Sequence, residues 1–180
     1  MKQSFLLASF ILFIFFQSSC SPKLAGDKVL LPPIIETTNQ SQKYNLQLDM
    51  MKHHFSGMLI VRKISDKEIR ILGSTYFGLS LFDFSLHNDD FIVNSCIAPM
   101  KKRQILLLLE NDFKNLFLSN RNMAIKIKNN TFEKRTTGKR FGKSVFHLSE
   151  PTNGQANQIQ IRHPWIRLSI QLNKLNENNF

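Results

Sequence analysis

The sequence predicts an α+β, mostly β fold: an antiparallel, half-open β-barrel of about 9–11 strands with one main helix as its lid. Two observations predict it. Short segments in which apolar and polar residues alternate recur throughout residues 44–175, and the connections between them are short enough for hairpins. One segment in the middle of the chain instead repeats its apolar residues every three or four positions, which is the period of a helix.

The first half of this region predicts a meander of five strands. The predicted strands cover residues 44–49, 55–63, 68–72, 78–86 and 91–93. Polar residues separate them, as at Ser65, Asp66 and Lys67, which suit a tight turn. The two longest of these strands are apolar on both faces, which favours contact with a helix on one side and with a second layer or a cavity lining on the other.

Residues 99–118 are predicted to form the main helix. Pro99 suits the first turn of a helix, because its missing N–H would have no partner there. The apolar side chains that would share one helical face are Ile105, Leu106, Leu109, Phe113, Leu116 and Phe117. Charged residues fall mainly on the other face, so the helix is expected to pack its apolar stripe against the sheet.

The second half predicts four or five further strands, within residues 123–128, 132–135, 142–149, 158–162 and 166–172. The last two alternate strictly, which is typical of strands with one apolar face and one solvated face. Strands on both sides of one helix can bend into a half-barrel whose concave face holds the helix. That concave side would be either a filled core or an apolar pocket.

The first 19 residues have the features of a secretory signal. Lys2 supplies a positive charge, and residues 5–16 are an apolar run of twelve, shorter than the roughly 20 residues of a membrane-spanning helix. The following Ser18, Ser19 and Cys20 resemble the lipobox of bacterial lipoproteins. The resemblance implies cleavage before Cys20 and a lipid anchor, of the palmitate type, on its sulfur. Ordinary secretion and an uncleaved anchor are the alternatives.

The chain is expected to divide into a signal peptide (1–19), a lipidated tether (20–43), a single β-barrel and helix domain (44–175) and a tail (176–180). Pro32 and Pro33 favour an extended tether, although its apolar residues could pack on the domain. Ser21 rather than Asp follows Cys20, and no acidic run comes after it. The expected location is therefore the periplasmic face of the outer membrane, with membrane lipid as the partner of Cys20.

The composition favours contact with lipid. The 180-residue chain has a formal net charge of +11 and sixteen phenylalanines against two tyrosines and one tryptophan. Phenylalanine offers a large apolar area without a polar group, which suits acyl chains. A secreted basic protein rarely meets nucleic acid, so we expect no nucleic-acid partner and favour anionic phospholipid or lipopolysaccharide. The alternative is that the cations only keep the outer strand faces soluble.

Two strand motifs resemble a known family. Residues 55–61 form a Phe-x-Gly-x-Leu-Ile-Val strand, and residues 77–84 read Phe-Gly-Leu-Ser-Leu-Phe-Asp-Phe. With the lipobox, the proline-bearing tether and the strand–helix–strand order, they make residues 44–175 similar to the LolA/LolB-like superfamily of outer-membrane lipoprotein carriers and acceptors. The resemblance implies an open β-barrel with a helical lid and an apolar cavity that holds acyl chains.

The same resemblance implies a loop that acts at the membrane. LolB-type members take lipoproteins from a soluble periplasmic carrier and insert them in the outer membrane, using a loop that bears an exposed apolar residue. The nearest equivalent here is residues 73–78, with Tyr76 and Phe77 as candidate tips. The alternative is that these two residues begin the next strand.

The candidate cavity lining consists of apolar residues on the predicted strands and on the helical stripe: Leu59, Val61, Ile69, Ile71, Phe82, Phe84, Leu86, Leu106, Leu109, Phe113, Ile125, Ile127 and Leu168. These residues would bind acyl chains in a lipoprotein-transport or chaperone role in which no bond is broken. The alternative is a non-catalytic, anchored interaction or scaffold module of an outer-membrane complex.

No catalytic residue, metal site or cofactor is expected. The histidines lack Glu or Cys at ligand spacing and are expected in exposed positions: His53, His54, His87, His147 and His163. No Gly-x-Ser-x-Gly elbow and no glycine-rich phosphate loop occur. Cys96 has no cysteine partner once Cys20 is lipidated, so it is expected to be a buried, inert thiol.

Overall fold

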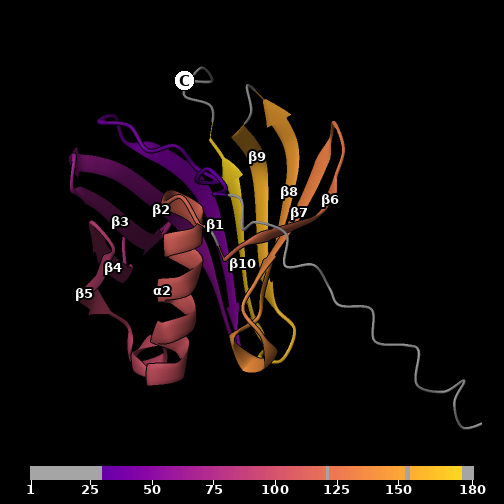
Figure 1. Cartoon of the computed structure of the whole chain (residues 1–180). Helices are drawn as coiled ribbons and strands as arrows, with labels where there is room; N and C mark the ends of the chain where they lie inside the picture. Colours follow the sequence, from indigo (N-terminus) through magenta and orange to yellow (C-terminus); the bar gives the residue numbers. More distant parts are fainter. Residues whose placement is uncertain (1–29, 121, 153–154, 176–180) are drawn as a thin grey trace, which may run out of the picture.

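The computed structural model describes residues 30–120, 122–152 and 155–175 (Figure 1). The predicted signal peptide, the lipidation site Cys20, the first part of the tether and the tail lie outside the described residues. None of the described helices is both long enough and apolar enough to span a membrane.

The described residues form ten strands and one α-helix. In chain order the elements are β1 (Gln42–Met50), β2 (His53–Ser65), β3 (Glu68–Thr75), β4 (Ser80–His87), β5 (Asp90–Cys96), the 3-10 turn η2 (Ala98–Lys101), α2 (Arg103–Phe117), β6 (Ala124–Lys128), β7 (Phe132–Thr137), the 3-10 turn η3 (Arg140–Gly142), β8 (Ser144–Thr152), β9 (Gln155–His163) and β10 (Leu168–Lys174). The predicted order of five strands, one helix and four or five further strands is confirmed, with five strands after the helix.

All ten strands belong to one antiparallel sheet of order β5-β4-β3-β2-β1-β10-β9-β8-β7-β6. The two halves of the chain join where β1 pairs with β10, with Tyr44 opposite Lys174 and Met50 opposite Leu168. Strands β5 and β6 are the free edges, so the sheet does not close. Figure 1 shows the sheet bending into two walls, with α2 on its concave side. The predicted architecture, a mostly β fold with an antiparallel sheet that does not close, is confirmed.

The helix begins later than the sequence predicted. Pro99 lies in η2 rather than in α2, and Lys102 between them is extended, with φ −64° and ψ 126°. The predicted start at residue 99 is therefore wrong by four residues. The break leaves Met100 facing the interior, where none of its surface is exposed.

The core lies on the concave, inner face of the sheet, on both sides of α2. Phe113 packs against Phe82 and Phe84 of β4, with ring centroids 5.7 Å and 5.8 Å away. The preceding residue, Asp112, instead contacts His163 at the end of β9. Two consecutive residues of α2 thus contact opposite halves of the sheet, which places the helix inside the bend rather than over its rim.

Residues 30–41, here called the strap, pack on the domain without forming a helix or a strand of the sheet. Leu31 and Asn120 exchange two backbone hydrogen bonds of 3.0 Å, and the Ile35 N–H donates to the Leu116 carbonyl at 2.9 Å. Ile34 and Ile35 are only 4% and 2% exposed and belong to the core. Part of the predicted tether is therefore built into the fold, which the apolar residues after the two prolines had suggested.

Candidate functional site

Most of the predicted lining residues meet in one apolar cluster. Ten of the thirteen belong to the buried core: Leu59, Val61, Ile69, Ile71, Phe82, Phe84, Leu86, Leu109, Phe113 and Leu168. They come from β2, β3, β4, α2 and β10, because the alternation of each strand turns the same set of side chains to the inner face. The strands and the helical stripe therefore share one apolar interior.

Three predicted lining residues lie outside this core. Leu106 is only half-buried, and Ile125 and Ile127 on β6 are 38% and 51% exposed. Strand β6 is an edge of the sheet, and all five of its residues are exposed. Alternation alone indicated a strand here, but it could not indicate what would cover that strand.

Side chains fill the space between α2 and β4–β5. Phe113 lies among four other phenylalanine rings, and the centroids of Phe91 and Phe117 are 6.4 Å and 6.2 Å from its own. The Phe82 and Phe84 rings stack on each other at 4.8 Å. Three cavities of the described residues lie elsewhere, two on the outer face and one beneath the strap.

One cavity, of about 180 Å³, lies between the strap and the inner face of β6–β9. Its lining includes Ile34 of the strap and Leu148 and Ala156 of the sheet. The buried Arg135 of β7 donates to the Pro32 carbonyl at 3.0 Å and so holds the strap over this cavity. Sequence reasoning did not assign a lining role to the strap or to β8 and β9.

At its other end the strap is tied to β2. The Lys63 N–H donates to the Thr38 carbonyl at 2.9 Å, and Arg62 Nε donates to the Asn39 carbonyl at 3.0 Å. The strap therefore crosses from the β7 side of the bent sheet to the β2 side. Its hydrogen bonds are few, since it lacks the continuous ladder of a strand.

A buried polar network joins α2 to β8 and β9. Asp112 Oδ1 accepts from Ser144 Oγ at 2.7 Å, and Asp112 Oδ2 lies 2.7 Å from His163 Nε2. Burial raises the pKa of the Asp112 carboxyl, and its hydrogen bonds to His163 and Ser144 oppose that rise. Asn111 Nδ2 extends the network by donating to Ser144 Oγ at 3.2 Å.

The expectation that His163 is exposed is wrong, because only 4% of this residue is accessible. The His-Pro sequence marks the end of β9, but the side chain points inward to meet Asp112. Ser144 and His163 each bond to Asp112 rather than to each other, so they do not form a base-activated nucleophile. The network serves to fix α2 against the sheet.

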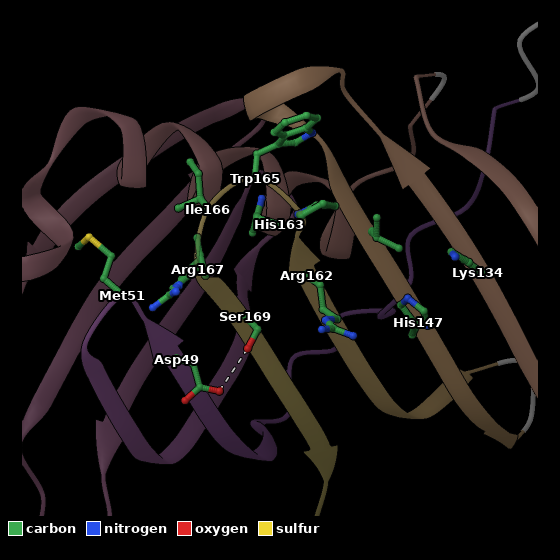
Figure 2. A pocket seen from close by; sticks show the side chains of 13 residues that line it. Asp49, Met51, Lys134, His147, Arg162, His163, Trp165, Ile166, Arg167 and Ser169 are labelled. Carbon is green, nitrogen blue, oxygen red and sulfur yellow. Dashed lines mark hydrogen bonds between the residues drawn. The ribbon is translucent and has the colours of Figure 1, made fainter.

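A second cavity, of about 770 Å³, is a groove on the outer face at one end of the sheet (Figure 2). Three cations and one carboxylate line it: Lys134 on β7, Arg162 on β9, Arg167 in the β9–β10 turn and Asp49 on β1. Figure 2 shows Lys134, His147 and Arg162 on neighbouring strands. Burial lowers the pKa of His147, and the nearby Lys134 and Arg162 lower it further. The groove therefore carries a positive field suited to an anion.

The residues proposed as a loop tip form the turn between β3 and β4. Tyr76, Phe77 and Leu79 are 59%, 95% and 68% exposed, and β4 begins only at Ser80. The turn is possible because Gly78 has φ +81°, a conformation that residues with a side chain rarely adopt. Phe77 is thus presented to solvent, and the alternative that Tyr76 and Phe77 begin the next strand does not hold.

In the described ranges no group of three or more His, Cys, Asp or Glu side chains could hold a metal ion. Cys96 is half-buried at the end of β5, and burial raises the pKa of its thiol while Lys101 partly offsets that rise. Its neutral thiol form is therefore favoured over the reactive thiolate. No protein-family model matches this chain, and no curated protein matches it significantly.

Proposed function

We propose that the protein is a membrane-anchored, non-catalytic lipoprotein that binds acyl chains within its bent sheet and accepts or inserts lipoproteins at the outer membrane. This is the role of the LolA/LolB-like proteins that its sequence resembles. The observation that carries the proposal is the strap. An irregular segment, rather than a strand or a helix, crosses the apolar interior above a cavity.

The inner surface has the chemistry that an acyl chain requires. On β1, Tyr44, Leu46, Leu48 and Met50 are all at most 2% exposed and face the interior. The matching inward residues of the other half, on β8, β9 and β10, are Phe146, Leu148, Ile159, Ile161, Ile170 and Leu172. An apolar ligand entering from the strap side would meet the same kind of surface on both walls.

The cavity under the strap is too small for a whole acyl chain as it stands. Ligand pockets usually enclose about 300–1,000 Å³, whereas this one encloses about 180 Å³. Ile34 and Ile35 occupy adjoining space, so we infer that an incoming chain replaces them. Exposing two isoleucines costs roughly 3–6 kcal/mol, and burying ten methylene groups gains roughly 8 kcal/mol. The exchange is therefore favourable for a long acyl chain.

The alternative function, a tethered scaffold or interaction module, is favoured by the phenylalanine cluster. Phe82, Phe84, Phe91, Phe113 and Phe117 pack ring against ring between α2 and the first half of the sheet. A protein whose whole interior behaved in this way would bind no acyl chain. The two functions therefore differ in whether the strap moves off the interior to admit an acyl chain: the carrier requires this movement, and the scaffold does not.

Binding of a fluorescent sixteen-carbon fatty acid to the full chain tests the proposal. We expect saturable binding, and we expect Ile34→Ser together with Ile35→Ser to increase the affinity because the strap then competes less well. Leu30→Ser is the matched control, since Leu30 belongs to the same segment but is 51% exposed. Absence of binding in the wild-type chain and in the double variant would leave only the scaffold function.

A further inference from the structure

Three connections meet at one end of the sheet, on the rim of the outer groove. The Met51 N–H in the β1–β2 turn donates to the Arg167 carbonyl in the β9–β10 turn at 2.6 Å. The rings of Phe141, in the β7–β8 connection, and Trp165, in the β9–β10 turn, lie edge to face with centroids 6.0 Å apart. Residues 51–52, 138–143 and 164–167 thus form one continuous surface, here called the basic end.

The basic end carries cations without carboxylates. Its charged residues are Lys52, Lys139, Arg140, Lys143 and Arg167. Among the residues that the structure describes, none of these five forms an ion pair with an acidic side chain. The turns at the opposite end of the strands hold charges of both signs, with Asp66 and Lys67 in the β2–β3 turn and Asp89 in the β4–β5 turn. The basic end therefore differs from the opposite end in that its three connections hold cations and no carboxylate.

Large apolar side chains project from the same surface. Phe141, Trp165 and Met51 are 67%, 63% and 41% exposed. Most of the apolar area of these side chains remains in contact with water, so burying it against another surface would be favourable. Tryptophan and other aromatic side chains beside Lys and Arg are typical of protein segments at the interface between water and lipid headgroups.

The groove adds room for a headgroup behind these side chains. Arg162, Arg167 and Trp165 all line its volume of about 770 Å³. Its lining offers a phosphate the guanidinium groups of Arg162 and Arg167, which bind phosphate oxygens well because of their forked geometry. The one carboxylate of the lining, Asp49, already accepts from Ser169 Oγ at 3.2 Å and contacts His54. Figure 2 shows Trp165 in the turn at one side of the groove and Arg162 on the strand below it.

We propose that the basic end docks on a membrane surface of anionic phospholipid, with Phe141 and Trp165 entering the headgroup region and the five cations contacting phosphates. The inference does not depend on acyl-chain binding inside the sheet. A lipid surface fits better than an acidic protein, because the apolar groups stand on the tips of separate turns rather than around a groove that would receive a polypeptide. Because these turns lie at one end of the strands, docking would also direct that end of every strand toward the membrane.

Trp165 is the only tryptophan of the chain, so its fluorescence reports the basic end directly. The full chain is mixed with vesicles of pure phosphatidylcholine and with vesicles that also contain phosphatidylglycerol. We expect Trp165 emission to shift to shorter wavelength, and to be quenched by brominated acyl chains, only with the anionic vesicles. High salt should weaken the effect, because it screens the attraction between exposed charges.

Substitution separates this surface from any other contact with the vesicle. The triple variant Lys139→Gln, Arg140→Gln and Lys143→Gln should lose most of the shift. Lys67→Gln, an exposed cation in the opposite β2–β3 turn, is the matched control and should keep it. A tryptophan that stays in water on anionic vesicles would overturn the proposal. So would a shift caused by polyglutamate but not by the vesicles, which would assign the surface to an acidic protein.

Discussion

Asp112 of α2 and His163 of β9 form a hydrogen-bonded pair whose two side chains are both fully buried, with 2.7 Å between Oδ2 and Nε2. This pair fixes the helix to the second half of the sheet, while Phe113, the next residue, packs on the first half. A buried pair of this kind contributes less to stability than to arrangement, because both groups lose their hydration. It therefore specifies where α2 lies inside the bent sheet.

Asp112→Asn should be tolerated far better than Asp112→Ala. The amide can still accept from Ser144 and bond to His163, and it removes a carboxylate whose burial raises its pKa. We expect its free energy of unfolding to stay within about 1 kcal/mol of the wild type, whereas alanine leaves two buried polar partners unpaired and costs about 3–5 kcal/mol. Urea unfolding followed by circular dichroism measures both. Equal losses would show that the charge itself is essential.

Lys134→Gln should raise the pKa of His147. Burial is the main cause of its lowered pKa and will persist, but one of the two cations that repel the imidazolium is removed. Titration of the ring protons by NMR measures the change. Lys126→Gln on the exposed strand β6 is the control, because Lys126 does not act on His147. An unchanged pKa in Lys134→Gln would contradict the field that we assign to the outer groove.

The His147 imidazole also makes the stability of the protein depend on pH. His147 binds protons less readily in the folded chain than in the unfolded chain, where its pKa is near 6.5. Its contribution to stability is therefore complete above that value, and it is lost as the pH falls through the lower pKa of the folded state. Urea unfolding at several pH values should show wild-type stability falling over that window. His147→Gln should show a smaller fall, and an identical fall in both proteins would assign it to other groups.

Gly57→Ala should destabilise the protein strongly. A Cβ atom built at Gly57 would lie 1.8 Å from the Ser74 carbonyl oxygen of the neighbouring strand, and backbone cannot move aside cheaply. We expect a loss of at least about 1–3 kcal/mol. Gly142→Ala is the control, because a Cβ there would meet nothing within 4 Å. This close approach also gives a physical reason for the glycine in the Phe-x-Gly strand motif. A melting temperature that is unchanged in Gly57→Ala would contradict the close approach of these two strands at Gly57.

Much of the architecture could be predicted from the sequence, because local patterns determine which face of each element is apolar. Strict alternation at residues 166–172 corresponds to β10, where Leu168, Ile170 and Leu172 are buried. The same pattern at Ile125 and Ile127 also corresponds to a strand, but those side chains are exposed. Alternation reports the conformation of one strand and says nothing about the layer that covers it.

The interior site was less predictable because it depends on contacts between distant segments. His163 is buried only because Asp112 reaches it from the helix, 51 residues earlier in the chain. The strap became part of the core through Ile34 and Ile35, and the only local signal was an apolar pair after two prolines. Sequence patterns cannot show that Leu116 and Asn120 would bind this segment.

Locking the strap tests the account most directly. Leu31 and Asn120 form a hydrogen-bonded antiparallel pair, whose Cα atoms are typically about 5.5 Å apart, within the range of a disulfide. The variant carries Leu31→Cys and Asn120→Cys, with Cys20→Ser and Cys96→Ser to leave one pair. Oxidised protein should bind the fluorescent fatty acid about tenfold more weakly than the same protein after reduction, because the disulfide holds the strap in its closed position. Equal binding in both states, or none in either, would contradict entry of acyl chains beneath the strap.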